Sequence, residues 1–427
     1  MPHATTSDAF LLGLESLMRR SGQGAHLSAT VLEIDGAPDR EALTLATEAM
    51  GYRHPLLHAH LHRSPLTFIA AWTPGPAAPV PLHFHVGEAL AALVSRLING
   101  NSINIFRPGA NLELHILEED HRHFLILLWP HSLFDGIGID KLIGELDSTD
   151  GTPREDWGET NRASGSPSEL WKTADPMVRE MRTFPESNIR SLHRPSRAPG
   201  TACFEVIDFD LDTSAAIRAK MAGSVGELLS TPYFGAASAR AVAAVLAGRD
   251  EPSASILLSL PIQRINDPAK RPLFHNHMTA WSLLLEKSSL TDLTQATKSL
   301  FRSYGSFRKR KLHTAMDALT KLNERCPSRF YLLPIKHYLK GEICSLFHSH
   351  IGEFASGTDE LFGHRILNAY HIPTVSTPPG VGIFFSEKNK RLSCTLSWRE
   401  GALDPAELTT LRQQLLTDLG AGLPVVS

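Results

Sequence analysis

The stretch His123–Leu146, HFLILLWPHSLFDGIGIDKLIGEL, contains the features that decide the fold. Its first part, His123–Trp129, is mostly apolar, and so short an apolar run that stops at a proline predicts a buried strand rather than a helix. From Ile139 to Leu146 the apolar residues recur at i, i+3, i+4 and i+7, which is one face of a helix. The segment His131–Gly136 therefore lies on a turn between a strand and a helix. Side chains that meet ligands are often found on such turns, because a rigid scaffold positions them.

This turn carries the pattern HxxxDG, formed by His131, Asp135 and Gly136. At the composition of this chain the pattern would arise by chance roughly 0.07 times. It occurs once, and its strand–turn–helix context is one that chance does not supply. His313 and Asp317 repeat the HxxxD spacing without the glycine, and we interpret them as parts of a surface helix.

The composition is that of a soluble globular protein, with 427 residues, 42% hydrophobic and 20% charged, and a formal net charge of −3. A nearly balanced charge argues against nucleic acid as the main partner, because phosphate binding needs a concentrated basic surface. No apolar run reaches the roughly 18 residues that a membrane-spanning helix needs. The first residues lack a positive region followed by an apolar core, so we expect no secretory signal.

The four cysteines are scattered along the second half of the chain without a CxxC spacing: Cys203, Cys326, Cys344 and Cys394. This arrangement predicts reduced thiols in a cytoplasmic protein and does not indicate a cysteine-bound metal.

Alternating histidines raise the question of a metal site. His58, His60 and His62 alternate along a predicted strand, and imidazoles on one strand face could bind a metal ion. No carboxylate or cysteine lies at a useful spacing beside them, which argues against a metal site. His83 and His85 share the spacing and are interpreted in the same way, so we expect no metal.

Strands and helices are mixed irregularly in both halves of the chain, without a βαβα rhythm, and this predicts an α+β fold. Between residues 148 and 200 the chain becomes polar and rich in Pro, Ser and Arg, which is typical of a linker. We therefore expect an N-terminal lobe over 1–190, which carries HxxxDG and includes the linker region 148–200, and a C-terminal lobe over 201–427. Other predicted elements include strands at Leu56–His62 and Thr67–Trp72 and a long helix at about Val225–Leu246.

HxxxDG after a strand resembles the active-site signature of the CoA-dependent acyltransferase superfamily. That group includes chloramphenicol acetyltransferase, plant alcohol acyltransferases, wax ester synthases and the condensation domains of nonribosomal peptide synthetases. Several members carry HHxxxDG, and Pro130 stands here in place of the first His. The DFGWG segment of the plant enzymes is absent.

Weaker similarities follow in the family's order along nearly the whole chain. They are Arg53–His58, which resembles R-H-P-x-L-R with His58 in place of the last Arg; LPIQR, which ends at Arg264 and resembles P-x-x-R; His275–His277, where many members have Gly-Asn; and Ser349–Gly352, which resembles S-N-x-G.

The resemblance implies two chloramphenicol-acetyltransferase-like lobes in a V, with a tunnel between them. A thioester donor and a nucleophile enter from opposite sides and meet at His131. The implied activity is transfer of an acyl group from acyl-CoA, or from the phosphopantetheine thioester of an acyl or peptidyl carrier protein, to a hydroxyl or amine of a small acceptor. The thioester is a co-substrate, and no tightly bound cofactor is implied.

His131 is the candidate general base, because a neutral imidazole with a pKa near ambient pH can take the acceptor's proton. The alternative is a buried histidine bound to a backbone carbonyl. By resemblance Asp135 is a structural support that turns away from the tunnel and pairs with a cation. The family's usual partner is the Arg that is His58 here, so we predict that Asp135 pairs with His58, with His60 or with another base nearby.

The remaining site residues are also implied by the resemblance. Gly136 would let substrate or backbone approach closely. Asn276 and Ser349 would line the tunnel and donate hydrogen bonds to the developing oxyanion or to the pantetheine arm, and Trp398 would wall the acceptor pocket. The alternatives are ordinary strand-end hydrogen bonds for the first two and a core position for Trp398. The basic run Arg308–Lys311 could hold the 3′-phosphate of CoA or an acidic carrier protein, or could simply be a solvated end of a helix.

Three functional alternatives stay open beside the leading one. The first is a condensation-like enzyme of secondary metabolism that strictly depends on a carrier protein. The second is a catalytically silent homologue that binds a carrier or a metabolite, for which the departures at Pro130, His58 and His275 would be signs of degeneration. The third is a wax-ester-type enzyme with a long apolar tunnel. We expect a monomer in each case.

Overall fold

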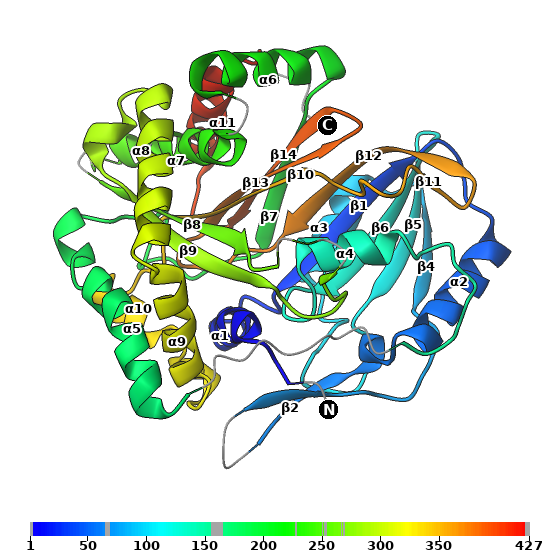
Figure 1. Ribbon diagram of the computed structural model, residues 1–427. Coiled ribbons are helices and arrows are strands. Elements are labelled where there is room, and N and C mark those ends of the chain that lie inside the picture. The colour runs from blue at the N-terminus through cyan, green and yellow to red at the C-terminus, as the bar shows by residue number, and fades with distance from the viewer. Residues whose placement is uncertain are drawn as a thin grey trace.

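The structure, a computed structural model, describes residues 3–64, 69–154, 165–226, 229–249, 251, 254–265, 267 and 270–422. Two lobes that each contain a mixed sheet lie side by side, with helices packed against the sheets (Figure 1). The fold is α+β with paired lobes, as predicted.

The sheet of the first lobe has six strands in the order β11-β12-β1-β6-β5-β4. Their bounds are β1 Leu27–Ile34, β4 Leu82–Val86, β5 Glu113–Glu119, β6 Arg122–Pro130, β11 Glu360–Leu361 and β12 His364–Pro373. β12 comes from the C-terminal half of the chain, yet it pairs antiparallel with β1 from Ser28 opposite Pro373 onward. The expected division at residues 190–201 therefore describes the structure incompletely, because the second half returns to complete the first sheet.

The sheet of the second lobe also has six strands, in the order β7-β14-β13-β10-β8-β9. Their bounds are β7 Ala202–Asp208, β8 Ile256–Gln263, β9 Met278–Leu285, β10 Leu346–Glu353, β13 Val381–Lys388 and β14 Arg391–Arg399. A short hairpin of β2 (His60–Arg63) and β3 (Ala70–Thr73) stands apart from both sheets.

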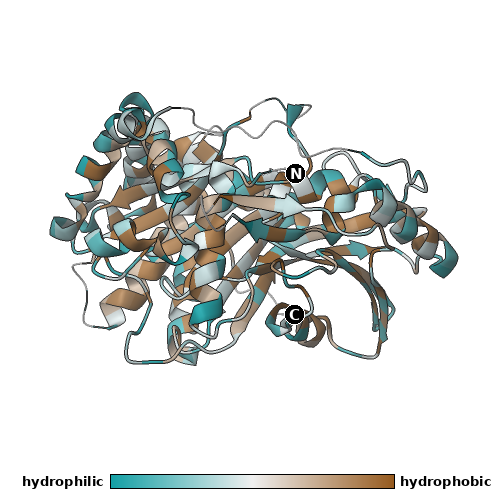
Figure 2. Ribbon diagram, turned by 90° about the horizontal axis from the view of Figure 1, so that it is seen from below, coloured by the Kyte–Doolittle hydropathy of each residue, from teal (hydrophilic) through white to brown (hydrophobic). Residues whose placement is uncertain are grey.

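The helices bury their apolar faces against these sheets and leave polar residues on the outer turns (Figure 2). Their bounds are α1 Thr6–Arg20, α2 Arg40–Arg53, α3 Leu90–Asn99, α4 Gly136–Ile143, α5 Pro167–Met181, α6 Leu211–Val225, α7 Ser230–Gly248, α8 Leu293–Lys309, α9 Leu312–Asn323, α10 Leu333–Tyr338 and α11 Pro405–Leu419, with 3₁₀ turns η1 Pro55–His58, η2 Phe184–Ser187, η5 Lys287–Leu290 and η6 Ser328–Phe330.

Two helices from the first 190 residues pack on the second lobe. α5 lies inside the predicted linker region, but its buried face, which includes Met177 and Met181, joins the core of the second lobe and packs on α9. α1 packs on η6 and α9, and its Leu14 lies with Ile343 in a small apolar cluster. Long-range packing, rather than the local sequence, therefore decides to which lobe α5 belongs.

Two predicted elements are wrong in detail. The predicted strand Leu56–His62 begins as the 3₁₀ turn η1, because Pro55 has no N–H to donate to a strand ladder and its φ is fixed near the helical value. His58 therefore does not share a strand with His60. The predicted long helix Val225–Leu246 is present as α7 but begins later, at Ser230, because α6 extends to Val225 and ends at Gly226, whose positive φ of +86° favours glycine. The predicted strand Thr67–Trp72 falls partly outside the described residues.

Among the helices that the structure describes, none combines the length and the apolar character needed to cross a membrane.

Arg53 holds the segment that follows α4, the helix that begins at the HxxxDG motif. Its side chain is fully buried at the end of α2. The guanidinium donates to the Ser148 carbonyl (3.0 Å) and hydroxyl (2.8 Å), and lies 3.3 Å from the Glu145 carboxylate. Arg154 binds the same carboxylate, also at 3.3 Å, but its side chain is 44% exposed.

We expect Arg53→Ala to lower the free energy of unfolding by about 2–3 kcal/mol, because it leaves buried acceptors without a donor. Arg154→Ala, which removes an exposed partner of the same Glu145, should change it by about 0.5 kcal/mol or less. Urea unfolding of both variants and the parent measures the difference. Equal effects would show that burial does not determine the contribution of Arg53.

Candidate active site

His131 follows the end of strand β6, beside the start of strand β1. Leu27 at the start of β1 pairs with Pro130 at the end of β6, so His26 and His131 face each other just beyond the ladder. The His131 N–H donates to the His26 carbonyl at 3.0 Å. The two imidazole rings stack with their centroids 5.2 Å apart and their planes 25° apart.

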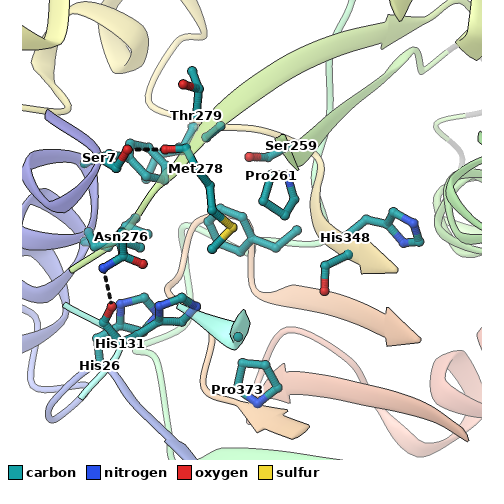
Figure 3. Close-up of a pocket in the computed structure, with 18 of the residues that line it drawn as sticks. Ser7, His26, His131, Ser259, Pro261, Asn276, Met278, Thr279, His348 and Pro373 are labelled. Atoms are coloured by element: carbon teal, nitrogen blue, oxygen red, sulfur yellow. Dashed lines mark hydrogen bonds between the residues drawn. The ribbon is translucent and has the colours of Figure 1, made fainter. Parts of the chain in front are cut away.

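A cavity of about 320 Å³ opens between the two lobes beside these rings. The first lobe contributes His26, His131 and Gly136 to its wall, and the second contributes mostly apolar side chains, among them Met278 and Phe385. In Figure 3 the rings of His131 and His26 lie on one side of this space, and His348 lies on the other. A molecule bound against either lobe in this cavity can therefore reach the His131 ring.

The surroundings of His131 keep its imidazole neutral. Burial disfavours the charged ring and lowers its pKa below the usual value of 6.5, although its own carbonyl and the Asp135 carboxylate favour protonation. A neutral imidazole can accept a proton. The ring lines the cavity, so it is not sealed inside the core, although the carbonyls of His131 and Phe134 lie beside it as in the alternative interpretation.

Asp135 is the N-cap of α4, and its partners are backbone amides. Its Oδ1 accepts hydrogen bonds from the N–H groups of Ile137 (3.1 Å) and Gly138 (2.8 Å), and its Oδ2 accepts one from His277 N–H (3.1 Å). The predicted pair with His58, His60 or another base does not form: no ion pair joins Asp135 to a basic side chain among the described residues. His58 lies in η1, and its ring is near the Ala78 carbonyl. Backbone N–H groups and the positive end of α4 stabilise the carboxylate instead of a cation.

The segment Leu273–His277, from the second half of the chain, holds the motif turn from outside. His275 N–H donates to the Leu133 carbonyl at 2.7 Å, next to the bond between His277 and Asp135. A Cβ on Gly138 would lie 2.2 Å from the Leu273 carbonyl oxygen. Gly138 is therefore the glycine that this close approach requires. At Gly136 a Cβ would meet the end of Ile351 at 3.4 Å and Nε2 of His371 at 3.7 Å, so no backbone approaches closely there, and the predicted approach of substrate stays a prediction.

Asp8, at the start of α1, holds this segment in place. Its fully buried carboxylate accepts from Thr5 N–H (2.6 Å) and from the Asn276 backbone N–H (2.9 Å), and Oδ2 lies 2.9 Å from Nδ1 of His275. Burial alone would raise the pKa of Asp8, but His275 and these hydrogen bonds outweigh it and lower the pKa. His275 has φ of +72°, at the position where the family often has Gly. Its bond to Asp8 helps to offset the steric cost of that conformation, about 1–2 kcal/mol.

Asn276 connects Asp8 to His131. Its Nδ2 donates to Asp8 Oδ1 (3.0 Å) and to the His131 carbonyl (2.9 Å), the second of which is drawn in Figure 3. The amide must face this way, because a carboxylate can only accept hydrogen bonds. Asn276 lines the cavity as predicted, but both of its N–H donors are occupied. Donation by Asn276 to an oxyanion is therefore not available in this arrangement, and Asn276 instead positions His131.

No protein-family model and no curated protein sequence matches the chain. Solved structures do match over nearly its whole length. Trichothecene 15-O-acetyltransferase TRI3 from Fusarium sporotrichioides has a TM-score of 0.70 at 15% identity, covering 98% of this chain and 94% of that one. The wax ester synthase/diacylglycerol acyltransferase from Marinobacter aquaeolei VT8 has a TM-score of 0.61 at 14% identity and 98% coverage of both chains. The first condensation domain of the CDA synthetase has a TM-score of 0.63 at 13% identity, covering 100% and 99%.

The chain therefore shares its fold with these acyltransferases and condensation domains. At these identities the similarity shows the fold alone. It agrees with the paired lobes expected from HxxxDG.

The other residues predicted from the superfamily pattern have different outcomes. Ser349 on β10 lines the cavity, and its role stays a prediction. Trp398 is absent from the cavity wall and packs half-buried against the core of the second lobe. The run Arg308–Lys311 is exposed where α8 ends, away from the cavity wall, and Arg310 pairs with Glu180 at 2.6 Å.

The interpretation of His313 and Asp317 as surface residues is wrong. Asp317 lines the cavity and pairs with Arg264, and the His313 ring stacks on Trp281 with centroids 5.7 Å apart. α9 packs on α5, so one face of α9 that the sequence pattern left to solvent is covered by another helix.

Three residues near the superfamily motif were not found from the sequence: Asp8, His26 and His371. His371 reaches the cavity from β12, and its Nδ1 lies 2.8 Å from the Thr30 hydroxyl, which accepts from Trp129 Nε1. Burial lowers the pKa of His371 to about 3, so the ring stays neutral. A T-T-S-D capping pattern marks Asp8 only as a helix start, and no local pattern connects His26 or His371 to the motif.

We expect Asp135→Asn to lower the free energy of unfolding by about 1–3 kcal/mol. Both carboxylate oxygens accept from N–H donors, so either orientation of the amide sets an NH₂ group against a donor. Asp39→Asn is the matched control, since Asp39 caps α2 with one oxygen, at 2.9 Å from Ala42 N, and Asn caps equally well. Thermal and urea unfolding compare the two. A loss no larger than that of the control would contradict the dual role of Asp135.

Proposed function

We propose that this protein is an acyltransferase that moves an acyl group from a thioester to a hydroxyl or amine, with His131 as general base. The observation that carries the proposal is the neutral imidazole of His131, which lies on a cavity wall built by both lobes. Two reactants that enter between the lobes can meet at this ring. The motif turn is held by Asp135 and Asn276, so the ring is positioned before any substrate binds.

The proposed step needs only proton transfers and one acyl exchange. His131 takes the proton of the acceptor O–H or N–H as the acceptor lone pair attacks the thioester carbonyl. The tetrahedral intermediate collapses with cleavage of the C–S bond. The proton on His131 then passes to the leaving thiolate, so the imidazole returns to its neutral form. The thioester is a co-substrate, and no tightly bound cofactor takes part.

Donors for the developing oxyanion must come from groups other than Asn276. Ser349 is the best remaining candidate, because its side chain lines the cavity and its hydroxyl has no hydrogen-bond partner among the described residues. The mostly apolar wall suits an acyl chain and strengthens polar contacts by excluding water.

The donor thioester can come from free acyl-CoA or from a carrier protein. The structural neighbours include both an acetyltransferase and a condensation domain, so both sources are consistent with the fold. We favour a small diffusible thioester or a carrier supplied in trans, and the assay below separates the two.

The direct test is release of free thiol from acyl-CoA, with acyl-loaded carrier protein as a second arm, in the presence of panels of alcohols and amines. We expect His131→Ala to reduce turnover at least about 100-fold, as for loss of a general base. His62→Ala, at an exposed histidine of β2, is the matched control and should keep parental turnover. Unchanged product formation by His131→Ala would contradict the proposal. Turnover with carrier-protein thioesters alone would indicate a condensation-type enzyme that strictly depends on a carrier. Ligand binding without turnover would indicate a catalytically silent homologue.

The pH profile gives a second prediction. Only the neutral imidazole acts as the base, so kcat/KM should fall as the pH drops through the pKa of His131. Burial lowers that pKa below 6.5, so the acid limb should have its midpoint below pH 6.5. Rate measurements between pH 4.5 and 8, within the range where circular dichroism shows a folded protein, test this. A midpoint above 6.5 would mean that the ring is not desolvated as the structure indicates.

A further inference from the structure

Four polar side chains share one face at the outer edge of the first sheet. β4 and β5 are parallel, and His83 lies opposite His115 in their register. Because side chains alternate along a strand, His85 lies on the same face as His83, and Glu113 on the same face as His115. β4 is the edge strand and pairs only with β5 among the described strands. None of the four residues lines the cavity between the lobes.

Three of these side chains meet at one point. One ligand atom from each of His83, Glu113 and His115 lies within 4.8 Å of the others. Nε2 of His115 and a carboxylate oxygen of Glu113 are 3.4 Å apart. Two ligands bound at about 2.1 Å to a tetrahedral zinc ion are separated by about the same distance, 3.4 Å. Imidazole and carboxylate are ligands that zinc accepts.

The charges at this point are incomplete without a cation. Glu113 is only 8% exposed, and no lysine or arginine lies within ion-pair distance of it in the described part of the chain. A buried carboxylate without a cationic side chain beside it favours a bound cation.

The ring nitrogen of His115 nearest to Glu113 is available to a ligand. Nε2 of His115 is buried and has no hydrogen-bond partner in the described structure.

The other nitrogen of His115 is already held in place. Its Nδ1 lies 3.1 Å from Nε2 of His85, whose Nδ1 is in turn 4.0 Å from a Glu88 oxygen. Arg96 binds Glu88 at 2.7 Å. Histidines that bind metals in this way donate their second N–H to an outer partner, which fixes the ring and its tautomer. The relay of His85, Glu88 and Arg96 provides this support.

We propose that His83, Glu113 and His115 form a binding site for one divalent transition-metal ion of the zinc type. Solvent supplies the fourth ligand, because His83 is exposed. The ion links the edge strand β4 to β5 and so stabilises the outer edge of the sheet. The site is independent of acyl transfer at His131.

The test uses the full chain after dialysis against EDTA. Isothermal titration with Zn²⁺ should give one ion per chain, and Co²⁺ should give the visible absorption bands of a tetrahedral site. His83→Gln and Glu113→Gln should each weaken zinc binding at least about tenfold, whereas His62→Gln, on an exposed strand outside the site, should not. The melting temperature should rise with Zn²⁺ in the parent and much less in His83→Gln.

His83 is exposed, so His83→Gln should fold as the parent does, and its melting temperature in EDTA checks this. Absence of a 1:1 complex would overturn the proposal, as would equal zinc affinity in the parent and His83→Gln. The second result would assign the binding to other surface histidines.

Discussion

The arrangement of the site depends on one buried carboxylate. Asp8 binds the backbone of Asn276, the ring of His275 and the start of its own helix, and it is fully enclosed. Through Asn276 the same carboxylate orients the carbonyl of His131. A buried charge is stable only when every lone pair has a donor. The N-terminal helix, the segment Leu273–His277 and the motif turn must therefore assemble together.

Within the described part of the chain no cation pairs with the carboxylate of this turn, which distinguishes it from the pattern that the resemblance implied. Asp135 accepts three backbone N–H groups, two from the start of α4 and one from His277. This solution explains how the chain tolerates His58 in place of an arginine. The ionic partner is unnecessary because helix-end amides already stabilise the charge. Close approach of the Leu273 carbonyl to Gly138 completes the enclosure.

The cavity is surrounded by imidazoles that burial keeps neutral. His131, His348 and His371 all have lowered pKa values, to about 3 for the latter two. Neutral rings bring no net charge into the cavity, and their nitrogen atoms can still form hydrogen bonds. A thioester carbonyl and its nucleophile would then meet one accessible base in surroundings that exclude water. The cluster on β4 and β5 differs from the cavity, because there a buried carboxylate accompanies the imidazoles.

Local sequence was enough to predict the strand, turn and helix around His131, since apolar periodicity and the glycine-containing turn act over a few residues. It also predicted the α+β class and, through the resemblance that HxxxDG carries, the paired lobes. These features need no knowledge of distant contacts. The place of Asn276 and Ser349 on the cavity wall followed from resemblance in the same way.

Tertiary structure alone decided which distant residues meet. Asp8 and Asn276 are separated by 268 positions, and no local pattern indicates that a helix cap will hold an active-site loop. The return of β12 to the first sheet brings His371 to the cavity, and the pairing of β5 with β4 brings Glu113 and His115 to His83. The sequence shows such residues only as isolated histidines and acids. Strand order and helix packing determine their neighbours, because burial of the whole apolar surface, rather than any single segment, selects the pairing.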